Sequence, residues 1–325
     1  MSSTTEEAAE RGDFIEADVR AAFEKAVLED GRPLAQIARE TPVAYGTLHA
    51  WRTGNYKGNN ERVTGQVHQW LTTREARQRT RATLPTAPEF KMTPSAGRIF
   101  DVLEHAQTLP DFVLVTGGAG IGKTSAAQAY QRHASNVFIC TIQPYVTSNK
   151  TLLDTIAEAM NVDTYWSIHM TMRQIIKKLH NSQGLLVLDE AQHLSSGLLD
   201  QVRHIHDGAN VGVALIGNTT VFSRLGAVQR TANFAQLFSR VGMRLNLELP
   251  RKADITMLLN AWDLEDKDAR ETAMGIGRDA GALRAMTKVL RMAWGLASVA
   301  GLEKPGAREI QDAWLQLNPD DKGAK

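Results

Sequence analysis

The middle of the chain alternates between short apolar runs and amphipathic stretches. The apolar runs are rich in Val, Leu and Ile, and they have the length of strands buried on both faces of a sheet. These runs lie at 112–116, 137–142, 185–188 and 213–216, and a last strand is expected at 243–249. Amphipathic stretches that favour helices lie at 95–108, 124–132, 150–160 and 171–181. The alternation predicts an α/β fold built on a parallel sheet.

Helical patterns flank this region on both sides. Turn residues at 31–33, 41–42 and 54–55 divide the first 81 residues into helices, and two prolines within 82–88 indicate a linker. Beyond Pro250, helices are expected at 253–262, 266–280, 283–300 and 307–317. The predicted organisation is an acidic disordered N-terminus (1–13), a small all-α domain (14–81), a linker (82–94), an α/β core (95–250), a helical lid (251–318) and a disordered tail (319–325).

Composition excludes several classes of protein. A chain of 325 residues with 43% hydrophobic and 22% charged residues can bury a core in two or three domains. Its single cysteine, Cys140, excludes a disulfide framework and a structural zinc site of several thiolates. No apolar run reaches the ~20 residues of a membrane span, and the acidic start is unlike a signal peptide. We therefore expect a cytoplasmic protein.

The formal net charge of +1 conceals an uneven distribution of charge. Residues 1–30 carry nine acidic and three basic side chains, whereas residues 31–82 carry nine basic and three acidic ones. The basic segment 31–82 could contact phosphates, and the acidic segment 1–30 is more typical of a solvated helix face.

A glycine-rich segment follows the first strand and opens a helix. Its sequence, Gly-Gly-Ala-Gly-Ile-Gly-Lys-Thr at 117–124, matches G-x-x-x-x-G-K-[ST] in full. Backbone N–H groups of such a loop surround phosphates, Lys123 reaches the β- and γ-phosphates, and the Thr124 hydroxyl binds Mg²⁺. The residues expected around the phosphates are Gly117, Gly118, Ala119, Gly120, Ile121, Gly122, Lys123, Thr124 and Ser125.

Two further strands end in polar residues. After the apolar run at 185–188, Asp189 is expected to hold Mg²⁺ through water, and Glu190 to orient and deprotonate the attacking water. After the run at 213–216, Asn218 can hydrogen-bond both the γ-phosphate and that water, although Gly-Asn is also an ordinary turn. We assign no role to the neighbouring His193.

The first domain carries a second motif. Residues 34–40 and 43–51 have the spacing of a helix–turn–helix. The core between the two helices is expected to consist of Ile37, Ala38, Val43, Leu48 and Trp51. Tyr45, Thr47, His49 and Arg52 would then face outward, where a DNA-reading helix needs them. A compact protein-interaction domain is the alternative interpretation.

The phosphate loop, the acidic strand end, the polar strand end and the helical lid together resemble the AAA+ ATPases. The resemblance implies that Asn218 is a polar sensor, and that Arg284, at the start of a lid helix, touches the γ-phosphate. It also implies that Arg240 is an arginine finger presented to the nucleotide of a neighbouring subunit. Arg230 and Arg244 compete with Arg240 for that role.

The order of several segments along the chain indicates one family within the AAA+ ATPases. These segments lie at 56–63, 117–124, 184–194, 234–240 and 281–284. Over about 14–317 the chain resembles the B proteins of bacteriophage Mu transposition. The resemblance implies a DNA-stimulated ATPase that uses ATP and Mg²⁺ in the cytoplasm of a bacterium or phage host. It also implies self-association into a helical filament or ring on double-stranded target DNA, which is delivered to a DDE-type transposase.

In AAA+ assemblies the segment between the second strand and the acidic strand lines the central channel. Here the resemblance directs attention to Lys150, Arg173, Lys177 and Lys178, although the last three also suit a solvated helix face. The aromatic residues at 164–169 suit either a DNA-facing loop or packing. Two other functions stay open: an ATP-switched helix–turn–helix transcription regulator and a helicase-loader-like ATPase.

Overall fold

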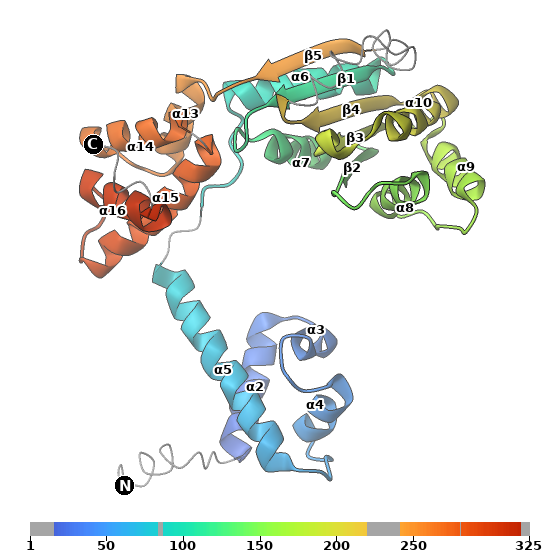
Figure 1. Ribbon diagram of the computed structural model, residues 1–325. Coiled ribbons are helices and arrows are strands. Elements are labelled where there is room, and N and C mark those ends of the chain that lie inside the picture. Colours follow the sequence, from blue (N-terminus) through green and yellow to red (C-terminus); the bar gives the residue numbers. More distant parts are fainter. Residues whose placement is uncertain (1–15, 84–86, 220–240, 280, 320–325) are drawn as a thin grey trace, which may run out of the picture. The chain divides into compact units, whose positions relative to one another are not determined.

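The chain folds into two units, 1–85 and 86–325, which we describe separately. The structure, a computed structural model, describes residues 16–83, 87–219, 241–279 and 281–319 (Figure 1). None of the helices in these ranges is long and apolar enough to cross a membrane.

The second unit is built on a parallel sheet of five strands. They are β1 (Phe112–Gly117), β2 (Val137–Thr141), β3 (Leu185–Asp189), β4 (Gly212–Gly217) and β5 (Val241–Leu247). Their order in the sheet is β2-β3-β4-β1-β5. The apolar runs that predicted strands are the strands observed, and β5 begins two residues earlier than expected. Because β4 lies between β3 and β1, the polar end of β4 lies between the acidic residues and the phosphate loop.

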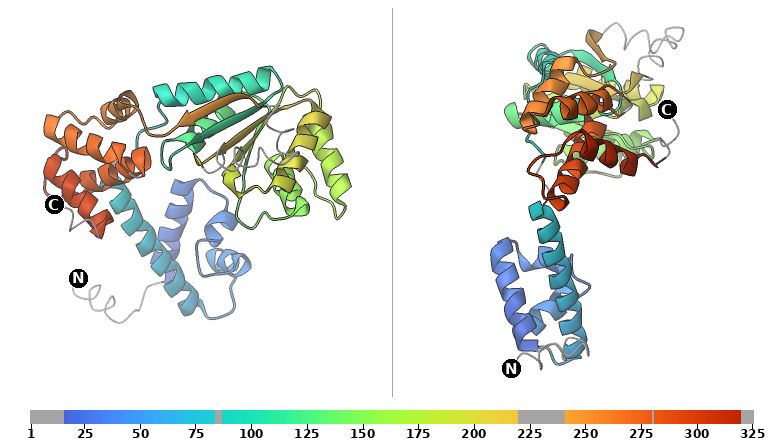
Figure 2. Two further views of the ribbon diagram at one scale, coloured as in Figure 1. Left: turned by 45° about the horizontal axis from the view of Figure 1, so that its top comes forward. Right: turned by 90° about the vertical axis from the view of Figure 1, so that its left-hand side faces the viewer.

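Helices cover both faces of this sheet (Figure 2). They are α6 (Pro94–Thr108), α7 (Lys123–His133), α8 (Asn149–Ala159), α9 (Ile168–Leu179) and α10 (Ser196–Ala209), with a 3₁₀ turn, η1, at Ala191–His193. Phe112 and Leu114 of β1 face α8, α9 and α10, whereas Val113 and Val115 face α6 and α7. Successive side chains of β1 therefore serve opposite cores, which explains why the strand is apolar throughout.

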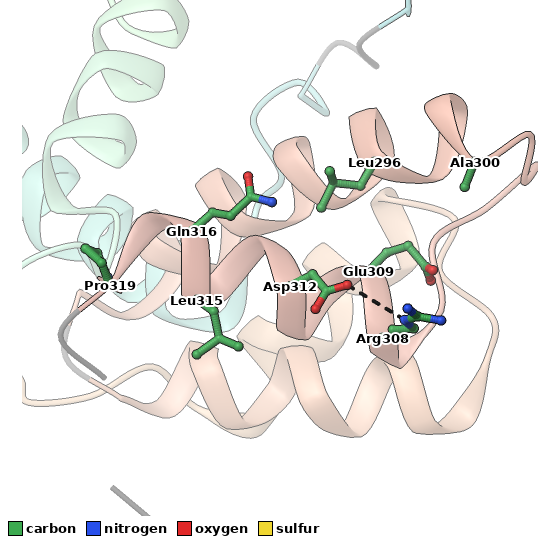
Figure 3. A pocket seen from close by; sticks show the side chains of 8 residues that line it. All are labelled: Leu296, Ala300, Arg308, Glu309, Asp312, Leu315, Gln316 and Pro319. Carbon is green, nitrogen blue, oxygen red and sulfur yellow. Dashed lines mark ion pairs between the residues drawn. The ribbon is translucent and has the colours of Figure 1, made fainter. Parts of the chain in front are cut away.

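The second unit ends in four helices, α13 (Lys252–Ala261), α14 (Lys267–Arg278), α15 (Ala282–Val299) and α16 (Ala307–Leu317). They enclose a core of their own around Leu259, Met286 and Leu290. A cavity of about 580 Å³ is lined by residues of α15 and α16 (Figure 3). The charged residues of its lining are Arg308, Glu309 and Asp312, and Arg308 pairs with Asp312 (3.9 Å), so the lining has no excess of cations for an anionic ligand. Phosphate chemistry is therefore expected elsewhere in this unit.

A buried carboxylate joins the lid to the sheet domain. Asp254 of α13 is fully buried and accepts hydrogen bonds from the Ser95 N–H (2.8 Å), the Ser95 hydroxyl (2.6 Å) and the Arg251 N–H (2.7 Å). It therefore satisfies N–H groups at the starts of both α6 and α13.

The first unit consists of α2 (Glu16–Asp30), α3 (Leu34–Ala38), α4 (Tyr45–Arg52) and α5 (Asn60–Thr83). The five side chains predicted to form the core between α3 and α4 are all buried. Phe23 of α2 packs edge-on against Trp51, and the Trp51 indole donates a hydrogen bond to Thr64 of α5 (3.1 Å). The short helices are thus held by the two long ones.

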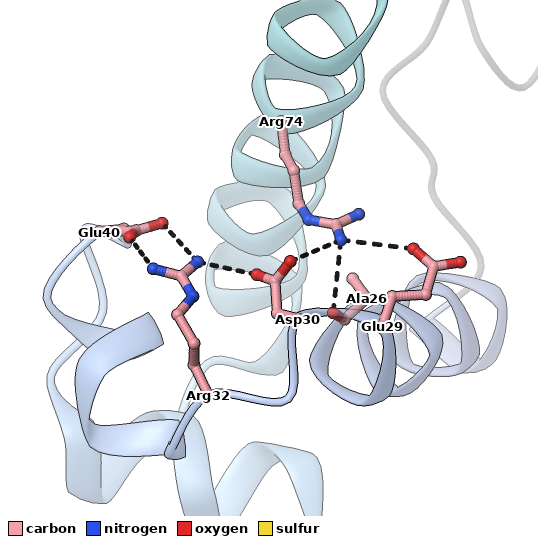
Figure 4. A network of polar contacts seen from close by, with 6 residues as sticks. All are labelled: Ala26, Glu29, Asp30, Arg32, Glu40 and Arg74. Atoms are coloured by element: carbon pink, nitrogen blue, oxygen red, sulfur yellow. Dashed lines mark hydrogen bonds and ion pairs between the residues drawn. The ribbon is translucent and has the colours of Figure 1, made fainter. Parts of the chain in front are cut away.

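Several charged residues of the first unit pair with one another, and Figure 4 shows one such network. Arg74 of α5 donates to Asp30 (2.8 Å) and Glu29 (3.3 Å), and Arg32 donates to Asp30 (2.8 Å) and Glu40 (2.5 Å). Hydrogen bonds from Arg74 and then Arg32 lower the pKa of Asp30. The acidic and basic halves seen in the sequence are therefore partly neutralised by each other rather than by phosphate or solvent.

Candidate nucleotide-binding site

The phosphate loop joins β1 to α7 through a left-handed backbone. Gly120 has φ +80° and Gly122 has φ +95°, conformations that side chains with a Cβ rarely adopt. A Cβ on Gly120 would also overlap the carbonyl of Gly281 in the lid. The motif glycines thus allow both the turn of the loop and the close approach of the lid.

Lys123 and Thr124 open α7 and point to different partners. The Lys123 ammonium donates hydrogen bonds to the carbonyls of Gly117 (2.9 Å) and Gly118 (2.8 Å). Burial lowers the pKa of Lys123, and the Arg284 charge acts in the same direction, whereas the charges of Asp189 and Glu190 oppose it. An anion at this ammonium would favour its charged form.

Thr124 and Asp189 meet as expected for the two protein contributions to a magnesium site. The Thr124 hydroxyl donates to the Asp189 carboxylate (2.7 Å), which is 2% exposed. Burial raises the pKa of Asp189, and the hydrogen bond from Thr124 opposes that shift. A cation beside a buried carboxylate offsets the cost of its charge, and a hydroxyl and a carboxylate are ligands that Mg²⁺ accepts together with phosphate oxygens and water. The residues present therefore fit Mg²⁺.

Glu190 and Asn218 are connected by a residue that the sequence analysis did not single out. Glu190 has φ +57° and its N–H donates to Asp189 (2.9 Å). The Gln192 amide donates to the Glu190 carboxylate, and its oxygen accepts from the Asn218 N–H (3.3 Å). Gln192 thus joins the acidic strand end to the end of β4. Its position two residues after Glu190 was the only signal in the sequence.

The lid reaches the phosphate loop through Arg284. Its N–H donates to the Gly120 carbonyl (3.1 Å), and its side chain is exposed. With Lys288 and Arg291, it brings three cations of α15 to the cavity described next. These cations suit a polyphosphate.

All these elements surround one cavity of about 780 Å³. The expected residues that line it are Ala119, Gly120, Ile121, Gly122, Lys123, Thr124, Ser125, Asp189, Glu190, Asn218 and Arg284. Gly117 and Gly118 lie against β5 instead: the Gly118 N–H donates to the Leu247 carbonyl (3.1 Å). Phe90 and Lys91, within the segment 82–94 that was expected to be a linker, also line the cavity with Leu258 and Leu283 of the lid. The apolar side chains of Phe90, Leu258 and Leu283 suit contact with a nucleotide base.

The residues expected at DNA are not gathered at this cavity. Lys150 is paired with Asp154 (2.5 Å), and Arg173, Lys177 and Lys178 are exposed on α9. In the first unit Tyr45 is 50% exposed and Thr47 is half-buried. Arg52 pairs with Glu24 through two hydrogen bonds (2.5 and 2.7 Å), so its guanidinium is held within that unit.

The candidates for the arginine finger differ in position. Arg240 and Arg230 lie outside the described residues. Arg244 is exposed on the edge strand β5.

Comparisons with solved structures agree with the fold. The chain is similar to the Aeropyrum pernix ORC1 protein in complex with DNA (TM-score 0.54, 21% identity, 73% of this chain and 68% of that one). It is also similar to the Aeropyrum pernix ORC2 protein (TM-score 0.53, 18% identity, 70% of each chain). The predicted fold class, an AAA+ P-loop core within the α/β class, is confirmed.

Sequence comparisons identify the family. Residues 107–225 match the family model "AAA domain", and residues 239–317 match "Mu B transposition protein, C terminal". The chain is 30% identical over 305 residues to the "ATP-dependent target DNA activator B" of Escherichia phage Mu, covering 94% of this chain and 96% of that protein. It is 32% identical over 257 residues to the "Mu-like prophage FluMu DNA transposition protein B" of Haemophilus influenzae, covering 78% and 88%. The resemblance seen in the sequence is confirmed: the chain belongs to the Mu B family of transposition proteins and is an AAA+ ATPase.

Proposed function

We propose that this chain binds target DNA when it holds ATP, assembles on that DNA and delivers it to a partner transposase. The observation that carries the proposal is the cavity in which Lys123, Asp189, Glu190 and Arg284 converge from the phosphate loop, β3 and the lid. The relative from phage Mu is named as an ATP-dependent target DNA activator and matches along 94% of this chain.

The proposed chemistry assigns one task to each group. Lys123 leaves the carbonyls of Gly117 and Gly118 and pairs with the β- and γ-phosphates. Thr124, and Asp189 through water, would hold Mg²⁺, and the ion would supply positive charge beside the phosphates. Glu190 accepts the proton of the attacking water, while Gln192 positions the Glu190 carboxylate.

Assembly is proposed to complete the site. The Arg240 side chain would neutralise γ-phosphate charge in the neighbouring subunit, so that a lone subunit hydrolyses ATP slowly. We further propose that the subunits form a helical filament or ring on double-stranded DNA in the bacterial cytoplasm, that DNA stimulates hydrolysis, and that the partner is a DDE-type transposase.

Within the second unit, α9 is the proposed DNA-contacting element. Arg173 and Lys177 are exposed on it, whereas Lys150 is engaged by Asp154 and has to leave that pair to contact a phosphate. In the first unit Tyr45 and Thr47 are proposed contacts of secondary importance, and Arg52 has to leave Glu24 to join them.

Electron microscopy of the protein with long duplex DNA tests the proposal. With ATP we expect protein-coated DNA with a regular repeat, and without nucleotide we expect bare DNA. The Lys123→Ala protein, which lacks the ammonium for the phosphates, is expected to leave DNA bare under both conditions. Coating that is independent of ATP, or binding confined to one palindromic site, would contradict the proposal and favour a transcription regulator.

A further inference from the structure

One tryptophan of this chain lies almost entirely in solvent. Trp166, in the loop between α8 and α9, is 99% exposed. The other five are buried or partly buried: Trp51, Trp70, Trp262, Trp294 and Trp314. Within the part of the chain that the structure describes, Trp166 therefore adds nothing to a core. Packing, the alternative interpretation for the aromatic residues at 164–169, does not account for this indole.

The loop that carries Trp166 is held in place on both sides. The fully buried Thr171 hydroxyl accepts a hydrogen bond from the Tyr165 N–H (3.0 Å) and donates one to the Tyr165 carbonyl (3.3 Å). On the other side, the Ser167 carbonyl accepts from the N–H groups of Met170 and Thr171 (3.1 Å each), which starts α9. A fixed backbone presents the indole outward, so ordering it on a ligand costs little backbone entropy.

The charges on the helix that follows are all cationic, and Ile168 and Met170 in its first turn are also exposed. Its buried residues are Thr171, Ile175 and Leu179. Arg173, Lys177 and Lys178 are exposed, and the helix contains no acidic residue. Arg173 and Lys177, four residues apart, lie on one face of the helix about 6 Å apart along its axis, so both can face the same DNA backbone.

We propose that Trp166 stacks on the bases of bound DNA while Arg173 and Lys177 contact its phosphates. An aromatic plane suits the π-face of any base, and cations suit the backbone, so the pair recognises DNA without reading its sequence. In a duplex the indole enters a base step as a wedge and partly unstacks it. This inference rests on the proposed DNA binding and extends it from phosphates to bases.

Binding of a fluorescent duplex to the full chain with ATP, measured by anisotropy over a range of salt concentrations, separates the two contributions. Trp166→Ala is expected to weaken binding about 5- to 100-fold with little change in the slope of log K against log salt, because a stacking contact releases no counterions. The double variant Arg173→Ala/Lys177→Ala is expected to lower the steepness of that slope by about 2. Trp166→Phe keeps an aromatic plane and is expected to retain most of the affinity.

The matched control is Val299→Ala. It removes another exposed apolar side chain, 89% exposed at the end of α15, and is expected to bind DNA as the wild type does. Intrinsic fluorescence supplies an independent readout: unlabelled DNA is expected to quench the tryptophan emission of the wild type, and this quenching is expected to be lost in Trp166→Phe.

The outcomes distinguish this inference from the function on which it rests. If the wild type binds DNA with ATP and Trp166→Ala binds equally well, the stacking role is overturned and the proposed function stands. If Trp166→Ala instead loses self-association in sedimentation without DNA, Trp166 is a subunit contact and the inference is also overturned. If the wild type itself does not bind DNA with ATP, the proposed function fails.

Discussion

At the residue scale, the account depends on Glu190 as the base. Its backbone is left-handed, and Gln192 donates to its carboxylate and accepts from the Asn218 N–H. All three residues line the cavity. An amide in place of this carboxylate keeps the shape of the side chain but cannot accept a proton. Glu190→Gln is therefore expected to bind ATP normally and to hydrolyse it about 10²- to 10⁴-fold more slowly.

Single-turnover hydrolysis and equilibrium ATP binding measure the two effects separately. His193→Ala is the matched control, because this neighbouring side chain is exposed and has no proposed role. Normal hydrolysis by Glu190→Gln would show that another group activates the water.

The sequence predicted those residues of the candidate site that belong to a short, continuous motif. The phosphate loop, Asp189 and Glu190 each follow an apolar strand directly, so their motif and spacing suffice. Gln192 was missed because its role depends on the backbone turn at Glu190 and on β4 lying beside β3.

The sequence also could not predict which acidic side chains pair with the surface cations. Arg52 finds Glu24 across 28 residues, and no periodicity indicates which charges meet. Similarly, periodicity cannot distinguish an aromatic residue that packs from one that is presented to solvent, as Trp166 is.

At the scale of elements, Asp254 connects the lid to the sheet domain. Removing its carboxylate leaves the buried Ser95 hydroxyl and N–H groups at the starts of α6 and α13 without their acceptor. We expect Asp254→Ala to lower the free energy of unfolding by about 2–3 kcal/mol. Because Arg284 of the lid bonds the phosphate loop at Gly120, ATP affinity should fall as well.

Denaturant unfolding and ATP titration test this role. Asp266→Ala is the matched control: Asp266 also caps a lid helix, accepting from the Ala269 N–H (2.7 Å), but it does so within the lid alone. It should cost about 1 kcal/mol and leave ATP affinity unchanged. Equal ATP affinities for Asp254→Ala and the wild type would contradict the coupling of lid and phosphate loop.

The order of elements along the chain was predictable, because the central strands are short apolar runs and the helices carry an amphipathic period. The residues at which helices and linkers begin and end were harder to predict. Helix α9 begins three residues before the predicted start, since the turn at Ser167 is fixed by the buried Thr171 rather than by an apolar repeat. The segment 88–93 was expected to be linker because it lacks periodicity, yet its residues line the cavity.

At the scale of the whole molecule, hydrolysis is proposed to need two subunits. Arg240→Ala should bind ATP but lose DNA-stimulated hydrolysis, since an arginine finger typically contributes ~10³–10⁵ in rate. Mixing it with Lys123→Ala forms interfaces that combine an intact phosphate loop with an intact finger, and steady-state ATPase activity should partly recover. Normal hydrolysis by Arg240→Ala alone would transfer the role to another arginine, with Arg230 the next candidate.

The central claim is that nucleotide in the cavity controls binding of DNA. Its most direct test is the dissociation constant for a random-sequence duplex, measured by anisotropy at one salt concentration with ATP, with ADP and without nucleotide. The wild type is expected to bind at least about 10-fold more tightly with ATP, a linkage of ~1.4 kcal/mol, and Lys123→Ala is expected to bind equally weakly in all three conditions. Equal DNA affinity of the wild type with ATP, with ADP and without nucleotide would contradict the account.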